Sequence, residues 1–329
     1  MSPLVYILVI VFLAWLYDFY NGMNDAANAI ATTISTRALT PGQAIMLAWF
    51  FNILGAFLTT RVAATVGKGI VDPVTVEQSV WVAALIGAIL WSAFCTHRGI
   101  PISITHSLIG GIIGAAVLSS GLAVLKWAGI RKVLIALVLS PLVGFILAYV
   151  LMLAVLWTFR WIHPSKANRV FRLGQIASAS FMALAHGSND TQNAMGMITA
   201  ALLASGYLSE FIVPFWVTFG SAFFMGLGTA VGGWKVIRTL GMRMVKIDPS
   251  QGFTAETSGA AAIIGATLLG APISTTHVIS TAIMGVGATR RLSAVRWGIA
   301  RDIVITWILT IPGAAIFAGA AWFVVRGLF

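Results

Sequence analysis

Two distant stretches of this chain carry nearly the same polar motif. Residues 22–29 read GMNDAANA and residues 187–194 read GSNDTQNA, so five of eight positions agree. A second pair follows in the same order. Residues 99–106 read GIPISITH and residues 270–277 read GAPISTTH, with six of eight positions identical. Two ordered matches with nearly the same separation indicate an internal duplication.

The composition places the duplicated chain in a lipid bilayer. Of its 329 residues, 59% are hydrophobic and only 9% are charged, and the mean hydropathy is +0.96. A soluble domain carries about 25% charged residues, because its surface must face water. Apolar runs that suit membrane helices of about 20 residues recur along the chain. We therefore predict an all-α, multi-pass protein of the cell membrane, meaning the plasma or inner membrane.

The duplication also predicts how the chain is divided. We expect a first transmembrane repeat over residues 1–159, a basic linker over 160–172 and a second transmembrane repeat over 173–329. Transporters commonly use inverted repeats, with the binding site near the bilayer midplane where the repeats meet. We expect that arrangement here, with broken helices or re-entrant hairpins at the two Pro-Ile-Ser segments.

The net charge of +11 has a plain explanation in a membrane protein. Lys and Arg fall mostly between apolar runs, as is typical of loops at the cytoplasmic face. No basic stripe is interleaved with stacking aromatics, so we expect no nucleic-acid partner. The single cysteine, Cys95, excludes an internal disulfide and a cysteine-based metal site.

The Asn-Asp motif supplies groups that suit a cation. Each residue of a helix advances about 100°, so the polar residues of one motif share one face. A carboxylate at membrane depth needs a cation or a proton. One such face could be a packing seam between helices, but two matched copies favour a site for Na⁺ or H⁺. The candidate ligands are Asp25, Asp190, Asn24 and Asn189, with the two aspartates as the Na⁺ ligands proper.

Three other residues bear on this cation site. Gly22 and Gly187 lie beside the polar residues, and we expect a local helix break whose freed carbonyls could coordinate the cation. Glu256 lies near the start of an apolar run. It is either a further coupling carboxylate or a helix cap.

The Pro-Ile-Ser segments predict helix starts inside the membrane. Pro fits the first helical turn, and Ser or Thr caps it. Free N–H groups and the positive end of the helix dipole bind anions there. Two such ends facing one another would hold a tetrahedral oxyanion, whereas two ordinary capped helices would lie at opposite surfaces. The candidate anion ligands are Ser103, Thr105, Ser274, Thr275 and Thr276.

His106 and His277 close the two Pro-Ile-Ser motifs at equivalent positions. Each could donate to the anion, carry a coupled proton or hydrogen-bond a carbonyl in the core.

Taken together, the duplicated Gly-x-Asn-Asp-x-x-Asn-Ala and Pro-Ile-Ser-x-Thr-His motifs resemble those of the inorganic phosphate transporter (PiT) family, from about Asp18 to Thr289. The resemblance implies a compact, prokaryotic-type symporter of phosphate with Na⁺ or H⁺. It also implies inverted repeats with re-entrant hairpins, a homodimer, and no cofactor beyond the transported ion. The central site would then be lined by Asn24, Asp25, Asn28, Asn189, Asp190, Asn193, Ser103, Thr105, Ser274, Thr275 and Thr276.

The second half departs from the first in two ways that bear on this site. Ile104 stands where the second half has Thr275, so we expect an asymmetric site with one hydroxyl fewer on one side. His186 replaces the equivalent of Asn21. The chain also lacks the long central hydrophilic loop found in some members of the family.

The motifs leave other functions open. A branch of the family carries sulfate, which is tetrahedral like phosphate, and a passive anion channel is a third reading. An intramembrane enzyme could use the His-x-x-x-Asp pattern of His186 and Asp190. However, the sequence has no HExxH motif and no activated nucleophile, so we expect no enzyme. Because a buried anion and buried carboxylates repel, we expect an alternating-access carrier in which cations bind together with phosphate.

Overall fold

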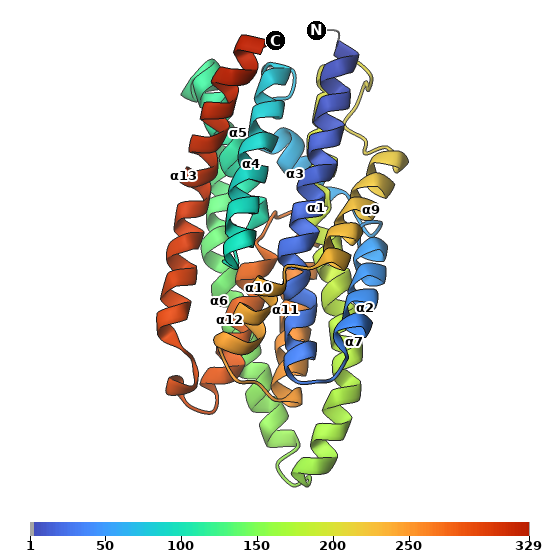
Figure 1. Cartoon of the computed structure of the whole chain (residues 1–329), viewed down its shortest axis with the longest axis vertical. Helices are drawn as coiled ribbons and strands as arrows, with labels where there is room; N and C mark the ends of the chain where they lie inside the picture. The colour runs from blue at the N-terminus through green and yellow to red at the C-terminus, as the bar shows by residue number, and fades with distance from the viewer. Residues whose placement is uncertain (1–2, 329) are drawn as a thin grey trace.

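The computed structural model describes residues 3–328, and the chain is helical without a β-sheet over this range. The first half comprises α1 (Pro3–Ser35), α2 (Pro41–Gly55), α3 (Arg61–Gly69), α4 (Gln78–Arg98), α5 (Ile104–Ser120), the 3-10 turn η1 (Leu122–Val124) and α6 (Trp127–Thr158). The second half comprises α7 (Pro164–Asp190), α8 (Gln192–Ala204), α9 (Phe215–Val231), α10 (Trp234–Arg238), the short π-helix η2 (Thr239–Arg243), α11 (Pro249–Leu268), α12 (Thr275–Ala288), the 3-10 turn η3 (Leu292–Ala294) and α13 (Trp297–Leu328) (Figure 1).

Four of the described helices are long and apolar enough to cross a membrane, namely α1, α4, α6 and α13. A fifth span results if α9 and the segment that follows it, which bends away by 62°, count as one. Along α6, large apolar side chains such as Leu134, Val138 and Ile146 are about half exposed. A surface of this kind is suited to lipid and not to water.

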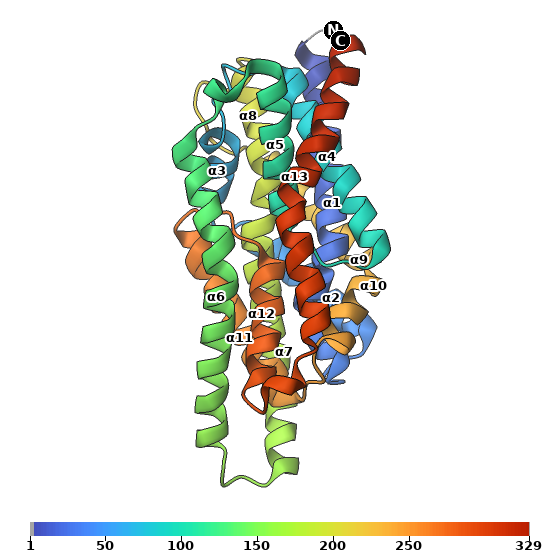
Figure 2. The same ribbon diagram turned by 90° about the vertical axis from the view of Figure 1, so that its left-hand side faces the viewer.

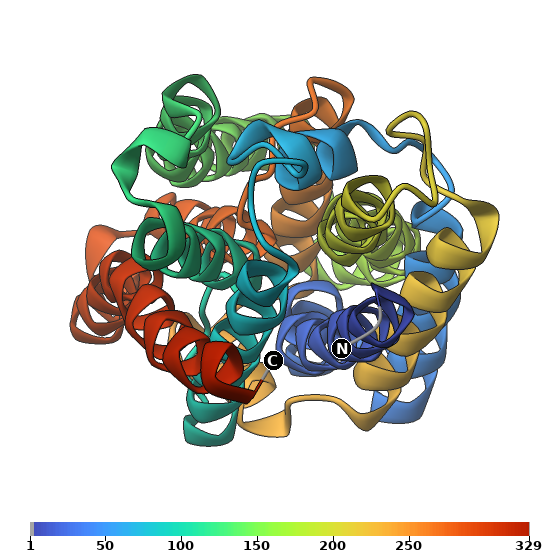
Figure 3. The ribbon, with the colours of Figure 1, turned by 90° about the horizontal axis from the view of Figure 1, so that it is seen from above.

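The two halves interleave in one elongated bundle (Figures 1 and 2). Helix α2 packs on α7, α3 on α8, α6 on α12, and α13 on α4 and α5. Seen from above, α1 lies between α4 and α9 (Figure 3). Helix α1 begins and α13 finishes at one end of the bundle, while α6 and α7 project at the other, where residues 159–163 join them (Figure 2). The centre of the bundle is therefore built from both halves.

Glycine allows the closest helix contacts in this bundle. A Cβ atom at Gly22 would lie 2.0 Å from the carbonyl oxygen of Met225, and one at Gly228 would lie 1.9 Å from that of Phe19. Small residues at such crossings are typical of membrane helices. The expected helix break at Gly22 and Gly187 is wrong, because α1 and α7 both continue through these glycines. The second copy does end its helix, but only beyond the glycine, at Asp190.

Both predicted helix starts in the Pro-Ile-Ser segments are present. Helix α4 ends directly before Gly99, and α11 ends two residues before Gly270. The φ values of these glycines, 72° and 62°, lie in the left-handed region that suits glycine. Ser103 Oγ then accepts a hydrogen bond from the His106 N–H at 3.1 Å. Ser274 Oγ accepts one from the His277 N–H at 3.2 Å. These two bonds cap α5 and α12.

We predict that Gly228→Ala destabilises the protein by about 1–3 kcal/mol, the usual cost of overpacking. The new methyl group would meet the backbone of Phe19, so α1 and α9 would have to separate. Thermal unfolding of the purified protein in detergent measures the effect as a lower Tm. Gly298→Ala is the control, because no atom lies within 4 Å of a Cβ there. Equal Tm values for the two variants would contradict this account of the packing.

Candidate functional site

The carboxylates of both Asn-Asp motifs meet the first turn of α12. Thr276 Oγ1 donates to Asp25 Oδ1 at 2.8 Å, and Thr275 Oγ1 donates to Asp190 Oδ2 at 2.9 Å. All four side chains are buried. The aspartates of two motifs from opposite halves of the chain thus converge on one helix start.

The last asparagine of each motif reaches a Pro-Ile-Ser helix of the other half. Asn28 Nδ2 donates to the hydroxyl oxygens of Thr275 and Thr276, both at 3.1 Å. Asn193 Nδ2 donates to Thr105 Oγ1 at 2.8 Å. The two motifs and the two helix starts therefore form one buried cluster, and the helix starts do not lie at opposite surfaces.

The first asparagine of each motif binds a different helix in an equivalent way. Asn24 Nδ2 donates to Thr96 Oγ1 at 2.7 Å, and Asn189 Nδ2 donates to Thr267 Oγ1 at 2.8 Å. These threonines lie near the ends of α4 and α11, and each precedes the glycine of its Pro-Ile-Ser segment by the same spacing. Their hydroxyls face the site although no motif marked them in the sequence.

Buried amide oxygens provide acceptor atoms at this site. In the described part of the chain, no hydrogen-bond donor contacts the side-chain oxygens of Asn24, Asn28, Asn189 and Asn193. Buried polar atoms without partners are rare in proteins. Carboxylate and amide oxygens are the ligands that hard cations prefer. The cluster can therefore supply a cation with both charged and neutral oxygen ligands.

His186 lies between the two aspartates. Its Nε2 atom is 3.4 Å from Asp190 Oδ2 and 3.9 Å from Asp25 Oδ2. Its Nδ1 atom lies 3.0 Å from Asn52 Oδ1, and Asn52 Nδ2 donates to Thr229 Oγ1 at 3.2 Å. One ligand atom from each of Asp25, His186 and Asp190 falls within a 4.8 Å group that could hold a cation.

The sequence marks His186 as the counterpart of Asn21 but predicts no contact between it and the two aspartates, and it does not mark Asn52 at all. The signal for His186 is its position one helical turn before Asp190, which puts both on one helix face. Asn52 is a lone polar residue in an apolar run, and nothing local distinguishes it from a packing asparagine.

Glu256 lies in a separate polar cluster. Its Oε1 atom accepts hydrogen bonds from Thr32 Oγ1 and from Gln175 Nε2, the latter at 3.0 Å, and its Oε2 atom accepts one from Ser178. Thr32 lies two helical turns beyond Asp25 on α1, which is about 10 Å along the helix axis. Glu256 is not a helix cap, because α11 begins at Pro249 and its N-cap is Asp248.

His106 and His277 face each other, with ring centroids 5.2 Å apart. Their four ring nitrogens have no hydrogen-bond partner in the described residues. His277 also stacks on Trp307, at a centroid distance of 3.8 Å. The pair therefore joins the two helix starts side by side, and the carbonyl contact considered from the sequence is not formed.

The expected asymmetry is visible at the first position of the two helices. Thr275 contacts both Asn28 and Asp190, whereas the equivalent Ile104 has no hydroxyl to offer. The carbonyl oxygen of Ile104 accepts a hydrogen bond from the Tyr17 hydroxyl at 3.0 Å, and its apolar side chain packs in the core.

The sequence and the fold of this chain are similar to those of known proteins. Residues 21–318 match the phosphate transporter family. A probable low-affinity inorganic phosphate transporter of Rhizobium meliloti is 47% identical over 94% of this chain and 93% of its own length. One from Bacillus subtilis is 45% identical over 99% of each chain. A solved structure titled the sodium-dependent phosphate transporter superimposes with a TM-score of 0.92 at 26% identity, covering 99% of this chain and 100% of the other.

These relatives are transporters and not enzymes, which settles the question raised by His186 and Asp190. With its apolar helices, the chain is a multi-pass protein of the cell membrane. The match spans most of the sequence and includes both Asn-Asp motifs and both Pro-Ile-Ser segments. The chain therefore belongs to the phosphate transporter family.

Proposed function

We propose that this protein is a secondary active transporter that carries inorganic phosphate into the cell together with cations, by alternating access. One observation carries the proposal: two anion-attracting helix starts and two buried carboxylates share a single cluster. Neither an anion nor a carboxylate is stable without a counter-charge in a buried cluster, so phosphate and the cations would bind together.

Phosphate would bind between the N-termini of α5 and α12. Free N–H groups and the positive ends of the helix dipoles favour an anion there. Hydroxyl and amide donors line the same space, and they now bond mainly to one another and to the aspartates. The proposed phosphate ligands are Ser103, Thr105, Ser274, Thr275, Thr276, Asn28 and Asn193, with His106 and His277 as further anion or proton contacts.

The cations would bind against Asp25 and Asp190, with Asn24 and Asn189 as neutral ligands. The structural neighbour is a sodium-dependent phosphate transporter, which supports Na⁺ as the coupling ion, and a proton is the alternative. Glu256 would be a separate coupling carboxylate, because three donors already hold it away from the centre. Two monovalent cations per monovalent phosphate would move one net positive charge, worth about 2.3 kcal/mol per 100 mV.

We propose further that residues 1–159 and 173–329 are inverted repeats joined by the linker 160–172. The equivalent helices α6 and α13 run in opposite directions along the bundle, which supports this arrangement (Figure 2). Helices α5 and α12 have 17 and 14 residues, which is short for a span of about 20. We therefore propose that α4–α5 and α11–α12 are re-entrant hairpins, although α4 by its length alone could cross the membrane. A homodimer, as the resemblance implies, stays a prediction.

Uptake into proteoliposomes tests the proposed function. Radiolabelled phosphate should accumulate under an imposed inward Na⁺ gradient or, for proton coupling, under an inward H⁺ gradient. Excess unlabelled sulfate should compete poorly if phosphate is the substrate. Phosphate flux that needs neither gradient would indicate a channel. Accumulation of sulfate without accumulation of phosphate would indicate that sulfate is the substrate.

We predict that Asp25→Asn and Asp190→Asn each abolish coupled uptake while leaving the fold intact. The amide keeps the size of the side chain but removes the charge that the cation needs. Radiolabelled phosphate accumulation in proteoliposomes measures the loss, and elution on size-exclusion chromatography checks the fold. Asp302→Asn is the control, since that side chain is 73% exposed. Full accumulation by either core variant would remove that aspartate from the mechanism.

We predict that Thr275→Ile raises the KM for phosphate roughly tenfold, the effect of losing about 1.4 kcal/mol from a hydrogen bond to a charged group. The change gives the second half the residue that the first half has at Ile104, and it removes the donor to Asp190. Initial uptake rates at varied phosphate concentration measure it. Thr275→Ser should restore the KM, because it keeps the hydroxyl. If the isoleucine variant has the wild-type KM, the Thr275 hydroxyl is not a substrate ligand.

A further inference from the structure

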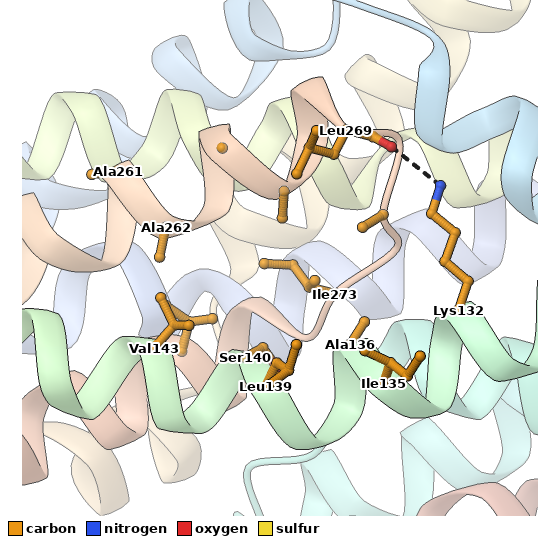
Figure 4. A pocket seen from close by; sticks show the side chains of 14 residues that line it. Lys132, Ile135, Ala136, Leu139, Ser140, Val143, Ala261, Ala262, Leu269 and Ile273 are labelled. Carbon is orange, nitrogen blue, oxygen red and sulfur yellow. Dashed lines mark hydrogen bonds between the residues drawn. The ribbon is translucent and has the colours of Figure 1, made fainter.

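A groove between α6 and α11 opens beside the second Pro-Ile-Ser segment. We call it the α6–α11 groove and define it by Ile135, Leu139 and Val143 of α6, Ala262 and Gly265 of α11, and Ile273 (Figure 4). Its volume of about 460 Å³ is in the range of small-molecule sites. Its lining is almost entirely apolar. Ile273 directly precedes the α12 cap Ser274, so the groove lies behind the proposed phosphate-binding turn.

The first half fills the equivalent space with its own side chains. When the alignment of the two Pro-Ile-Ser segments is extended backwards without a gap, Ala262 and Gly265 correspond to Trp91 and Phe94. The Trp91 ring lies against α13, where a Cβ at Gly313 would be 2.7 Å from it. Trp91 also packs beside Phe94, with ring centroids 6.2 Å apart. The second half lacks both rings, and a Cβ at Gly265 would meet nothing within 4 Å. The groove therefore corresponds to a space that aromatic side chains fill in the first half.

One end of the groove carries a positive charge. Lys132 Nζ donates to the carbonyl oxygen of Leu269 at 3.1 Å (Figure 4) and to that of Gly270 at 2.8 Å. An ammonium group has three donors, so one remains for a further acceptor. Ile135 and Leu139, which line the groove, are about half exposed, so the groove is open on this side to the lipid tails. An apolar slot that ends at a cation matches the acyl chain and phosphate of a phospholipid.

We propose that the α6–α11 groove binds one anionic phospholipid of the surrounding bilayer, with an acyl chain in the slot and the headgroup phosphate at Lys132. The acyl chain of the lipid would occupy the space that the side chains of Trp91 and Phe94 occupy in the first half. Through Ile273 it would brace the second Pro-Ile-Ser turn. Lipid binding itself goes beyond the proposed transport function and does not depend on it.

Photolabelling in vesicles tests this site without measuring transport. The protein is reconstituted in phosphatidylglycerol that carries a diazirine on an acyl chain, and the labelled peptides are mapped by mass spectrometry. We expect strong labelling of α6 around Leu139 and of α11 around Gly265. The double variant Ala262→Trp with Gly265→Phe copies the first half and should reduce this labelling several-fold. Gly298→Phe, at another open position, should leave it unchanged.

Two further variants keep the test decisive. Leu139→Trp fills the groove from α6 and should reduce labelling even if the double variant does not fold. Lys132→Met should remove any preference for labelled phosphatidylglycerol over labelled phosphatidylcholine. Undiminished labelling in folded groove-filling variants would overturn the proposal. So would a cross-link across the groove between two copies of the chain, because a second protein molecule would then be the occupant.

Discussion

The structure depends on keeping charge of one sign buried in a membrane-spanning bundle. Asp25 and Asp190 converge in the core, where an isolated carboxylate is strongly disfavoured. The threonine hydroxyls of α12 and the imidazole of His186 offset part of this cost. In the proposed mechanism, cations would offset the rest of this cost, and the two helix N-termini would then be a favourable place for an anion.

Much of this site could be predicted from the duplicated motifs. Because each motif occurs twice, the sequence indicates which residues should be equivalent, and the motifs do meet across the halves: Asp25 contacts Thr276, and Asn193 contacts Thr105. The helix starts at Ser103 and Ser274 follow from local capping chemistry, which sequence reports well. The helix break predicted at Gly22 is wrong. A glycine inside a helix can allow either close packing or local unwinding, and which of the two occurs depends on the helix packed against it. His186 and Asn52 acquire their roles from helices far apart in the sequence.

The two halves match closely at the centre and differ around it. In the same gapless alignment, Glu256 corresponds to Leu85, so the carboxylate at the centre of that polar cluster has no counterpart in the first half. Near Ala262 the second half is hollow where the first is filled by Trp91. Ile104 and Thr275 differ at the site itself. The shared residues preserve the cluster at the interface, whereas the differences give each half its own surroundings.

The interleaving of the halves also has a consequence for biogenesis. When α1 first enters the membrane, neither α7 nor α12 has been synthesised, so Asp25 has none of the partners that it finds in the finished protein. Helix α2 likewise waits for α7, and α3 waits for α8. During synthesis, the first half must therefore stay in the bilayer, or bound to the insertion machinery, while its polar groups lack their hydrogen-bonding partners from the second half. Assembly is completed only after translation has passed the second Pro-Ile-Ser segment.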